Sequence, residues 1–466
     1  MSAILWGKVA RPESAAYVTG QARSWAAQAS DESPLCIVAP TSALDVSVTL
    51  LMLRTVQCPF AVRAGGHTPF KGANNIDGGI TIDLRNLNTI KVSSDKKSVS
   101  VGPGNKWGQV YKVTDAAGVR VVGGRDWDVG VGGLLVGGGM SYFSGKYGFA
   151  VDNVISYTVV FADGTIREVT QKSYPDIFKA LRGGGNNFGI ITNFELNAYP
   201  GGNLWGGNRL FLAAYGQLPG MLDAVAKYNE DHSKDPDAAI IVSYIWAAAF
   251  NSWVIQTNLI HGKTAPYPAI LKSFTEITDG VIQDTLREDT LLNFALELGA
   301  ATAAGRRQTM WTFTTKNDAA LLKELATIFE SEMESVKSVP GNALTLNYQV
   351  MSTAITSNFK KNGGNPLGVS DAEPLILMNL SFSWDNASDD AKIMSAARNY
   401  YNRATAAAAA RNALHPYIYL NYADISLDVF GSYGAANKAE LVATHQKWDK
   451  NGVFTKLMPG GFKIEK

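Results

Sequence analysis

The chain has 466 residues, of which 46% are hydrophobic and 18% are charged, a balance that supports large folded cores and argues against global disorder. Its 42 Lys and Arg residues are matched by 41 Asp and Glu residues, so we expect no nucleic-acid partner. Five His and two Cys residues argue against a metal site or a disulfide framework. Glycine is abundant instead, with 45 residues, above the usual share of about 7%.

The N-terminus lacks the long apolar segment of a signal peptide, and no run of about 18 apolar residues occurs in the chain. We therefore expect no membrane span and a cytoplasmic location, while secretion stays open. Cys36 and Cys58 could form one disulfide in an oxidising compartment or could be two buried thiols, and the sequence favours neither.

The first part of the chain alternates between short apolar runs and polar turns. Residues 12–30 form an alanine-rich segment that predicts a helix. Apolar runs predict strands at residues 35–38, 60–63, 80–84 and 99–102. The amphipathic segment 43–56 between the first two runs indicates a β-α-β unit with parallel strands. Polar turns around residues 80–102 favour antiparallel strands there.

The pattern continues with a predicted hairpin at residues 155–168, whose turn is Asp163-Gly164. A helix is expected at residues 174–181 and a closing strand at residues 190–196.

The character of the sequence changes after residues 200–202. Residues 240–246 and 375–384 alternate as strands with one buried face do. Helices are predicted at residues 217–232, 318–336 and 388–413. Because the tail returns to tight aromatic and glycine motifs, we expect one domain made of residues 1–203 and 416–466. A second domain, residues 204–415, would be inserted into it.

The glycine clusters match neither common nucleotide fingerprint. Gly130-Val-Gly132 would need a glycine at Leu135 to complete a dinucleotide motif, and no P-loop occurs. Three glycine loops remain, at residues 63–67, 129–139 and 182–189. Their backbones could turn sharply around a phosphate or lie flat against a planar ligand. His67 sits in a Gly-Gly turn where packing needs no imidazole, so it could act as a nucleophile, a base or a covalent tether.

Five motifs occur in order: Arg63-Ala-Gly-Gly-His67, residues 129–139, residues 146–153, residues 182–191 and Tyr419-Leu-Asn-Tyr-Ala-Asp424. Together they resemble the berberine-bridge-enzyme-like FAD-linked oxidases of the vanillyl-alcohol-oxidase (PCMH-type) superfamily. The sequence is most similar in character to the fungal members, so we expect a fungal source. The resemblance implies an α+β fold. A two-piece FAD-binding domain would hold the flavin, and an inserted α+β substrate domain would cover it with an antiparallel sheet.

The resemblance also implies a cofactor, FAD, bonded covalently through His67 to the flavin 8α-methyl. Many relatives form a second link from a cysteine, but Asp126 stands at that position here, so we expect a single linkage. The implied cofactor-binding residues are Arg63, Ala64, Gly65, Gly66, His67, Thr68, Asp126, Val129, Gly130, Gly132, Gly133, Leu134, Met140, Asn186, Gly189, Ile191, Tyr419 and Asn421.

Tyr422 falls where relatives carry a catalytic tyrosine. A free tyrosine, with a pKa of ~10, is a poor base at neutral pH, so a nearby cation or the flavin would have to stabilise its phenolate. Asn379 aligns with a glutamate base of some relatives, and an amide can bind substrate but cannot act as a base. The same resemblance makes Val129 an oxygen-gating position. Tyr244, Trp246 and Gln349 are expected to line the substrate pocket.

These features predict an oxidase that passes a hydride from a small, largely apolar metabolite (an alcohol, an amine or an activated C–H) to flavin N5. O2 would reoxidise the flavin and yield H2O2, with or without ring closure of the product. Three alternatives stay open: a carbohydrate oxidase, a flavin-dependent isomerase or cyclase without net oxidation, and a flavin-binding protein without turnover. The sequence leaves the substrate and the oligomeric state undetermined.

Overall fold

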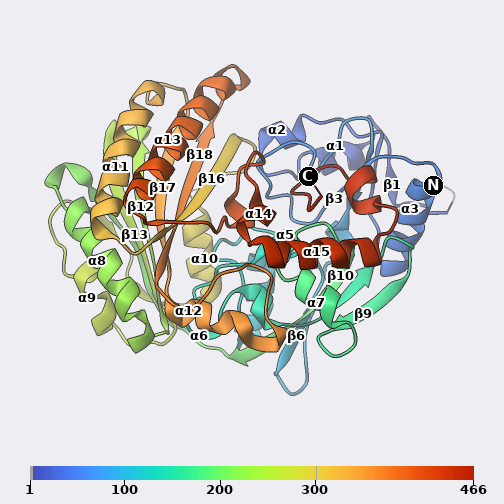
Figure 1. Ribbon diagram of the computed structural model, residues 1–466, viewed down its shortest axis with the longest axis horizontal. Helices are drawn as coiled ribbons and strands as arrows, with labels where there is room; N and C mark the ends of the chain where they lie inside the picture. Colours follow the sequence, from blue (N-terminus) through green and yellow to red (C-terminus); the bar gives the residue numbers. More distant parts are fainter. Residues whose placement is uncertain (1–3, 301, 466) are drawn as a thin grey trace.

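The structure is a computed structural model that describes residues 4–300 and 302–465. It has two lobes, one built on a large sheet with helices on its outer face and one that holds both chain termini (Figure 1). The mixture of sheets and helices confirms the α+β class. Among the described residues, no helix is both long and apolar enough to span a bilayer.

A four-stranded sheet opens the terminal lobe, in the order β1-β2-β4-β3. Its strands are β1 (Val9–Ala10), β2 (Cys36–Val38), β3 (Phe60–Arg63) and β4 (Ile80–Asp83). Helix α3 (Ala43–Thr55) joins β2 to β3, as the β-α-β pattern predicted. The expectation for residues 80–84 is corrected, because β4 runs parallel to both neighbours. The long connection after β3 lets the chain return in the same direction.

The predicted helix at residues 12–30 is broken into α1 (Ala15–Gln21) and α2 (Ala27–Ser30). Between them the backbone of Trp25 donates to Gly66 O at 2.9 Å, and Ala26 pairs with Arg306. The backbone groups that would continue the helix are used in these contacts with distant segments. Cys36 and Cys58 are free thiols.

The second sheet of this lobe has the order β5-β6-β10-β8-β9, and β7 also pairs with β10. Its strands are β5 (Ile90–Val92), β6 (Ser98–Val101), β7 (Val119–Val121), β8 (Val154–Val160), β9 (Ile166–Thr170) and β10 (Ile190–Pro200). Strands β8 and β9 form the predicted hairpin. The lobe's helices are α4 (Trp107–Ala117), α5 (Val131–Gly137), α6 (Ser144–Tyr147) and α7 (Pro175–Ala180).

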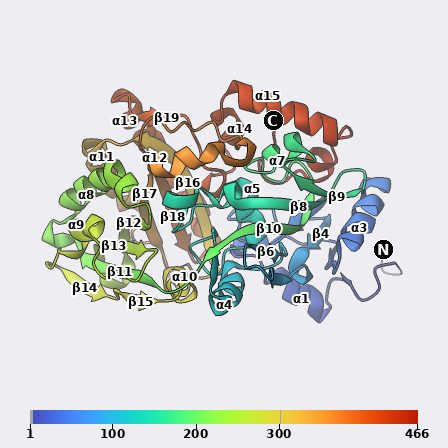
Figure 2. The ribbon, with the colours of Figure 1, turned by 90° about the horizontal axis from the view of Figure 1, so that it is seen from below.

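The C-terminal segment returns to the terminal lobe through α14 (Val429–Ser432) and α15 (Ala435–Trp448). Figure 2 shows α15 lying over α7. Asp176 of α7 accepts from Lys447 Nζ at 2.6 Å and from Trp448 Nε1 at 3.0 Å. These contacts join the C-terminal segment to the part of the terminal lobe that precedes the large sheet in sequence.

Residues 204–415 supply every strand of a nine-stranded antiparallel sheet, ordered β14-β11-β13-β12-β17-β18-β16-β19 with β15 beside β11. The strands are β11 (Leu204–Leu212), β12 (Ala238–Ala247), β13 (Ser252–His261), β14 (Val281–Asp284), β15 (Arg287–Asp289), β16 (Arg307–Lys316), β17 (Ala343–Met351), β18 (Leu375–Trp384) and β19 (Leu414–His415).

Helices α8 (Leu218–Asp231), α9 (Lys272–Thr275), α11 (Ala319–Met333) and α13 (Asp390–Ala410) cover the outer face of this sheet (Figure 1). Three of them are the helices predicted at residues 217–232, 318–336 and 388–413. Helix α10 (Leu291–Gly299) behaves differently, because Leu291 and Phe294 join the core of the terminal lobe. The inner face of the sheet is therefore free to form a wall between the lobes.

Candidate active site

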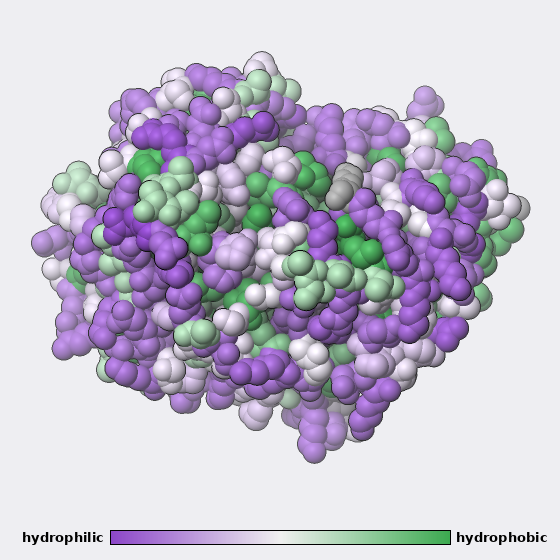
Figure 3. Space-filling model, viewed as in Figure 1, coloured by the Kyte–Doolittle hydropathy of each residue, from purple (hydrophilic) through white to green (hydrophobic). Residues whose placement is uncertain are grey.

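A cavity of about 440 Å³ lies between the glycine loops of the terminal lobe and the inner face of the large sheet. Figure 3 shows hydrophobic residues near the centre of the molecule's face, where the two lobes meet. The cavity thus has a wall made mostly of backbone and an opposite wall made of strand side chains.

Three glycines build the backbone wall in two different ways. A Cβ added at Gly65 would lie 2.3 Å from the Cα of Gly130, and one added at Gly132 would lie 2.8 Å from the Cβ of Ala64. Side chains at these positions would push the two loops apart. Gly133 also lines the cavity, but an added Cβ there would meet nothing within 4 Å. This glycine leaves room for a ligand.

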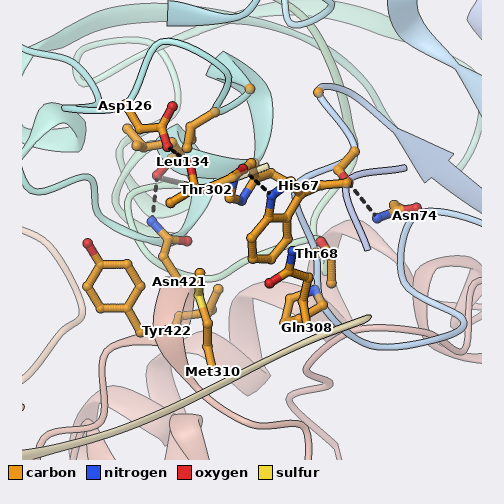
Figure 4. Close-up of a pocket in the computed structure, with 18 of the residues that line it drawn as sticks. His67, Thr68, Asn74, Asp126, Leu134, Thr302, Gln308, Met310, Asn421 and Tyr422 are labelled. Carbon is orange, nitrogen blue, oxygen red and sulfur yellow. Dashed lines mark hydrogen bonds between the residues drawn. The ribbon is translucent and has the colours of Figure 1, made fainter. Parts of the chain in front are cut away.

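His67 is held firmly in the cavity wall (Figure 4). Its ring stacks on that of Trp25, with centroids 4.1 Å apart and planes 12° from parallel. The Trp25 indole N–H in turn donates to Thr302 O at 3.0 Å. Burial lowers the pKa of His67, which favours the neutral imidazole. Its Nε2 is buried without a hydrogen-bond partner among the described residues.

Most of the predicted site residues line this single cavity. They are Ala64, Gly65, Gly66, His67, Thr68, Asp126, Val129, Gly130, Gly132, Gly133, Leu134, Met140, Asn186, Gly189, Ile191, Gln349, Asn379, Tyr419, Asn421 and Tyr422. The sequence motifs therefore converge in space although they are spread over more than 350 residues of the chain.

Arg63 is an exception, and its expected place at the cofactor is corrected. It is fully buried, and its Nη2 and Nε lie 2.9 and 3.2 Å from Asp83 Oδ2. Successive residues of a strand face opposite sides, so Val62 and Ala64 line the cavity while Arg63 points into the core.

Tyr419 fixes the C-terminal segment to the end of the glycine loop at residues 129–139. Its hydroxyl accepts from the backbone N–H groups of Gly139 at 2.8 Å and Met140 at 3.1 Å. Asn421 donates both to this hydroxyl and to Leu134 O, at 3.1 Å each (Figure 4). Burial raises the pKa of Tyr419 to about 12, so it stays protonated. These bonds place the neighbouring Tyr422 at the cavity.

The sequence analysis did not identify Arg125, a polar residue of the site that contacts both Tyr422 and Gln349. Its Nη2 donates to the Tyr422 hydroxyl at 2.8 Å and also to Gln349 Oε1. The guanidinium therefore joins the terminal lobe to the sheet. The available signal was an arginine directly after Gly123-Gly124 and directly before Asp126.

Tyr244 and Trp246 do not line the cavity, which corrects the expectation for both. They belong to the core beneath the outer helices, and the Tyr244 hydroxyl bonds Glu330 of α11. On the same strand the cavity is lined by Ile241, Ser243 and Ile245. The reason is again strand alternation, because the large aromatic side chains pack under the helices and the smaller residues face inward.

A row of polar side chains crosses the inner face of β12, β17 and β18. Ser243 Oγ donates to Asn347 Oδ1 at 2.6 Å, and Asn347 Nδ2 donates to Asn379 Oδ1 at 3.0 Å. Asn379 Nδ2 donates to Leu380 O at 3.0 Å. Because a backbone carbonyl can only accept, this last bond fixes the direction of the whole row. The Ser243 hydroxyl must therefore donate its proton to Asn347, so the Ser243 oxygen can only accept a hydrogen bond from a group in the cavity.

Comparisons with known proteins agree with this geometry. Residues 34–170 match the model of a family described as an FAD binding domain. An FAD-dependent monooxygenase of Fusarium proliferatum is 33% identical over 464 residues, covering 97% of this chain and 89% of the relative.

Two solved structures share the fold. The 6-hydroxy-D-nicotine oxidase of Arthrobacter nicotinovorans has a TM-score of 0.82 at 20% identity and covers 98% of each chain. A berberine-bridge-enzyme-like protein of Physcomitrella patens has a TM-score of 0.80 at 18% identity, covering 100% of this chain and 98% of its own.

The site fits the cofactor that these comparisons imply. Gly133 leaves open space along the cavity, and His67 offers a neutral imidazole with an unpaired nitrogen. The chain therefore belongs to the family of FAD-dependent oxidoreductases that includes the Fusarium relative, and it shares its fold with berberine-bridge-enzyme-like proteins.

Proposed function

We propose that this oxidoreductase is an oxidase of a small, largely apolar metabolite. The substrate loses a hydride and a proton, and O2 takes up the two electrons with two protons to form H2O2. FAD, when bound, supplies the hydride acceptor at N5 and the route of the electrons to O2. Everything else in the reaction depends on side chains of this cavity.

The observation that carries the proposal is the 2.8 Å hydrogen bond from Arg125 to the Tyr422 hydroxyl. A base must lose its own proton before it can take one from the substrate, and a phenolate is costly unless a cation lies beside it. The guanidinium supplies that cation at the phenol oxygen. Tyr422 is thus the residue we assign as the base, while Asn379, whose amide donates to backbone, holds the sheet wall in place.

We also propose that His67 bonds the flavin covalently and that this is the single link. The neutral imidazole is the nucleophilic form, and stacking on Trp25 restricts its rotation. Asp126, at the position of a second link in relatives, has no thiol. Its carboxylate accepts from the Thr302 hydroxyl at 2.6 Å.

The sheet wall supports a substrate with few charges. Among the residues that line the cavity, Arg125 and Asp126 carry the formal charges, and the strands contribute amides, hydroxyls and apolar groups. Val129 lines the cavity too, and its small side chain supports access of O2.

The experiment is a screen for oxygen consumption by the purified holoprotein over panels of alcohols, amines and sugars. Stoichiometric H2O2 with an oxidised product would support the proposal. A response limited to sugars would favour a carbohydrate oxidase, and product formation without oxygen uptake would favour an isomerase or cyclase.

The name of the Fusarium relative favours a second candidate, a monooxygenase. Reaction under 18O2 separates the two, because an oxidase leaves the label in H2O2 and a monooxygenase transfers one labelled atom to the product.

A further inference from the structure

Arg125 has hydrogen-bonding capacity that the protein does not use. A guanidinium carries five N–H donors. The two on Nη2 donate to the Tyr422 hydroxyl and to the Gln349 side-chain carbonyl. No hydrogen bond from Nε or Nη1 to the described residues is present, and neither nitrogen is a buried, unsatisfied atom. Three of the five N–H donors, one on Nε and two on Nη1, are therefore unused at the cavity that Arg125 lines.

The nearby carboxylates are already engaged. Asp126 accepts from the Thr302 hydroxyl at 2.6 Å and from the backbone N–H of Asp128 at 2.8 Å. Asp128 itself pairs with Lys106. Within residues 4–300 and 302–465, Arg125 forms no ion pair that would neutralise it.

Two other arginines of the same lobe show the contrast. Arg63 lies 2.9 Å from Asp83, and Arg182 lies 3.1 Å from Asp152, with all four side chains fully buried. Where this lobe buries an arginine for structure, it provides a carboxylate. Arg125 instead is half-buried, faces the cavity and has no carboxylate of the described residues paired with it, so its unused donors are placed to pair with an acidic group of a ligand.

We propose that Arg125 forms a subsite for an acidic oxygen of the substrate, either a carboxylate or the oxygen of an ionised phenol or enol. The proposal rests on the function proposed above and adds the substrate's chemical class. The bonds to Tyr422 and Gln349 orient the guanidinium, so its unused N–H donors on Nε and Nη1 remain available to such an oxygen in the cavity. The substrate is then a largely apolar molecule with one acidic group placed beside the base.

The test uses the holoprotein near neutral pH and follows the visible flavin spectrum during titration. The carboxylate arm compares sodium benzoate with benzamide. The phenolate arm compares pentafluorophenolate with pentafluoroanisole, its uncharged methyl ether. We expect at least one anion to bind at least tenfold more tightly than its neutral partner, and the arm that responds identifies the acidic group.

Three variants assign this preference to one side chain. Arg125→Gln should remove the preference for the anion, and Arg125→Lys should retain part of it because a charge without the planar fork remains. Lys392→Gln, on the exposed face of α13, removes one positive charge far from the cavity and should leave all four affinities unchanged. A melting curve and the flavin content of each variant establish that it is folded and loaded.

Anions that bind no better than their neutral partners to the unaltered holoprotein would overturn the inference, even if no Arg125 variant folds. Unchanged anion affinity in a folded Arg125→Gln variant would overturn it as well. Failure of the proposed function is recognised by a different readout. A holoprotein that takes up no oxygen with any substrate would contradict the oxidase, whereas the relative affinities for anions and neutral partners would still test the Arg125 subsite.

Discussion

The two walls of the cavity are built by different means. The terminal lobe presents backbone, with glycines that allow loops to pack against one another or leave open space, as at Gly65 and Gly133. The large sheet presents side chains in register across strands, as in the row from Ser243 to Asn379. A backbone wall suits a ligand shared by a whole family, since its shape depends on few residues. A side-chain wall can change by single substitutions, which suits a substrate specific to one enzyme.

The difference is sharpest at His67, the one side chain by which the backbone wall would hold its ligand permanently. His67→Ala should lower the fraction of flavin retained in acid-precipitated protein from nearly all to none. FAD should still bind non-covalently, because the glycine loops remain. Absorbance of the redissolved pellet and of the supernatant measures both fractions. Covalent flavin that persists in this variant would place the link elsewhere.

Tyr422→Phe should slow reduction of the flavin by the substrate by about 10²–10⁴-fold, the usual contribution of a general base. Reoxidation by O2 should change little, because that step needs no proton from the substrate carbon. Stopped-flow absorbance separates the two half-reactions. If flavin reduction and reoxidation slowed equally, Tyr422 would not be the base, and its role would be to maintain the structure of the cavity.

Two glycines on the backbone wall give a matched pair. In Gly65→Ala the new Cβ would meet the Gly130 backbone at 2.3 Å, so unfolding free energy should fall by about 3 kcal/mol or more. In Gly133→Ala it meets nothing, and the protein without FAD should be unchanged or more stable by up to about 1 kcal/mol, because α5 gains a better helix former.

Only Gly133→Ala is expected to weaken FAD binding without loss of stability. Denaturant unfolding of the flavin-free protein and titration with FAD measure the two effects. If both variants lose stability equally, the open space at Gly133 is not reserved for a ligand.

The smallest expected effects compare the two faces of the sheet. Tyr244→Phe removes the hydroxyl that bonds Glu330 under the helices and should cost about 1 kcal/mol of stability, with KM unchanged. Asn347→Ala breaks the polar row on the inner face and should raise KM several-fold. Steady-state kinetics with the substrate found by the oxygen screen, together with unfolding curves, would show the separation. A KM that rises in Tyr244→Phe would contradict the assigned faces.

The same comparison explains what the sequence could predict. The backbone wall lies in contiguous glycine motifs, so His67 and Gly130 could be located from the sequence, while Tyr422 was located through the family resemblance of its motif. Three site residues were misplaced because of strand alternation. Arg63, Tyr244 and Trp246 each lie one residue from a position that faces the cavity, and the pocket position expected for Tyr244 belongs to the smaller Ser243.

Other features depend on contacts between distant segments. The stacking of Trp25 on His67 joins residues that are 42 positions apart, and Arg125 reaches Tyr422 across 297 positions. No periodicity or local motif carries this information. Likewise the parallel course of β4 follows from a long connection whose path the sequence does not specify.

We propose that this cavity holds one FAD, which is bonded to the protein once, through His67. Mass spectrometry of the intact protein, followed by mapping of its flavin-bearing peptide, tests it directly. We expect one added FAD and a single modified peptide that contains His67. An unmodified protein, a second flavin-linked residue, or flavin on a peptide without His67 would contradict it.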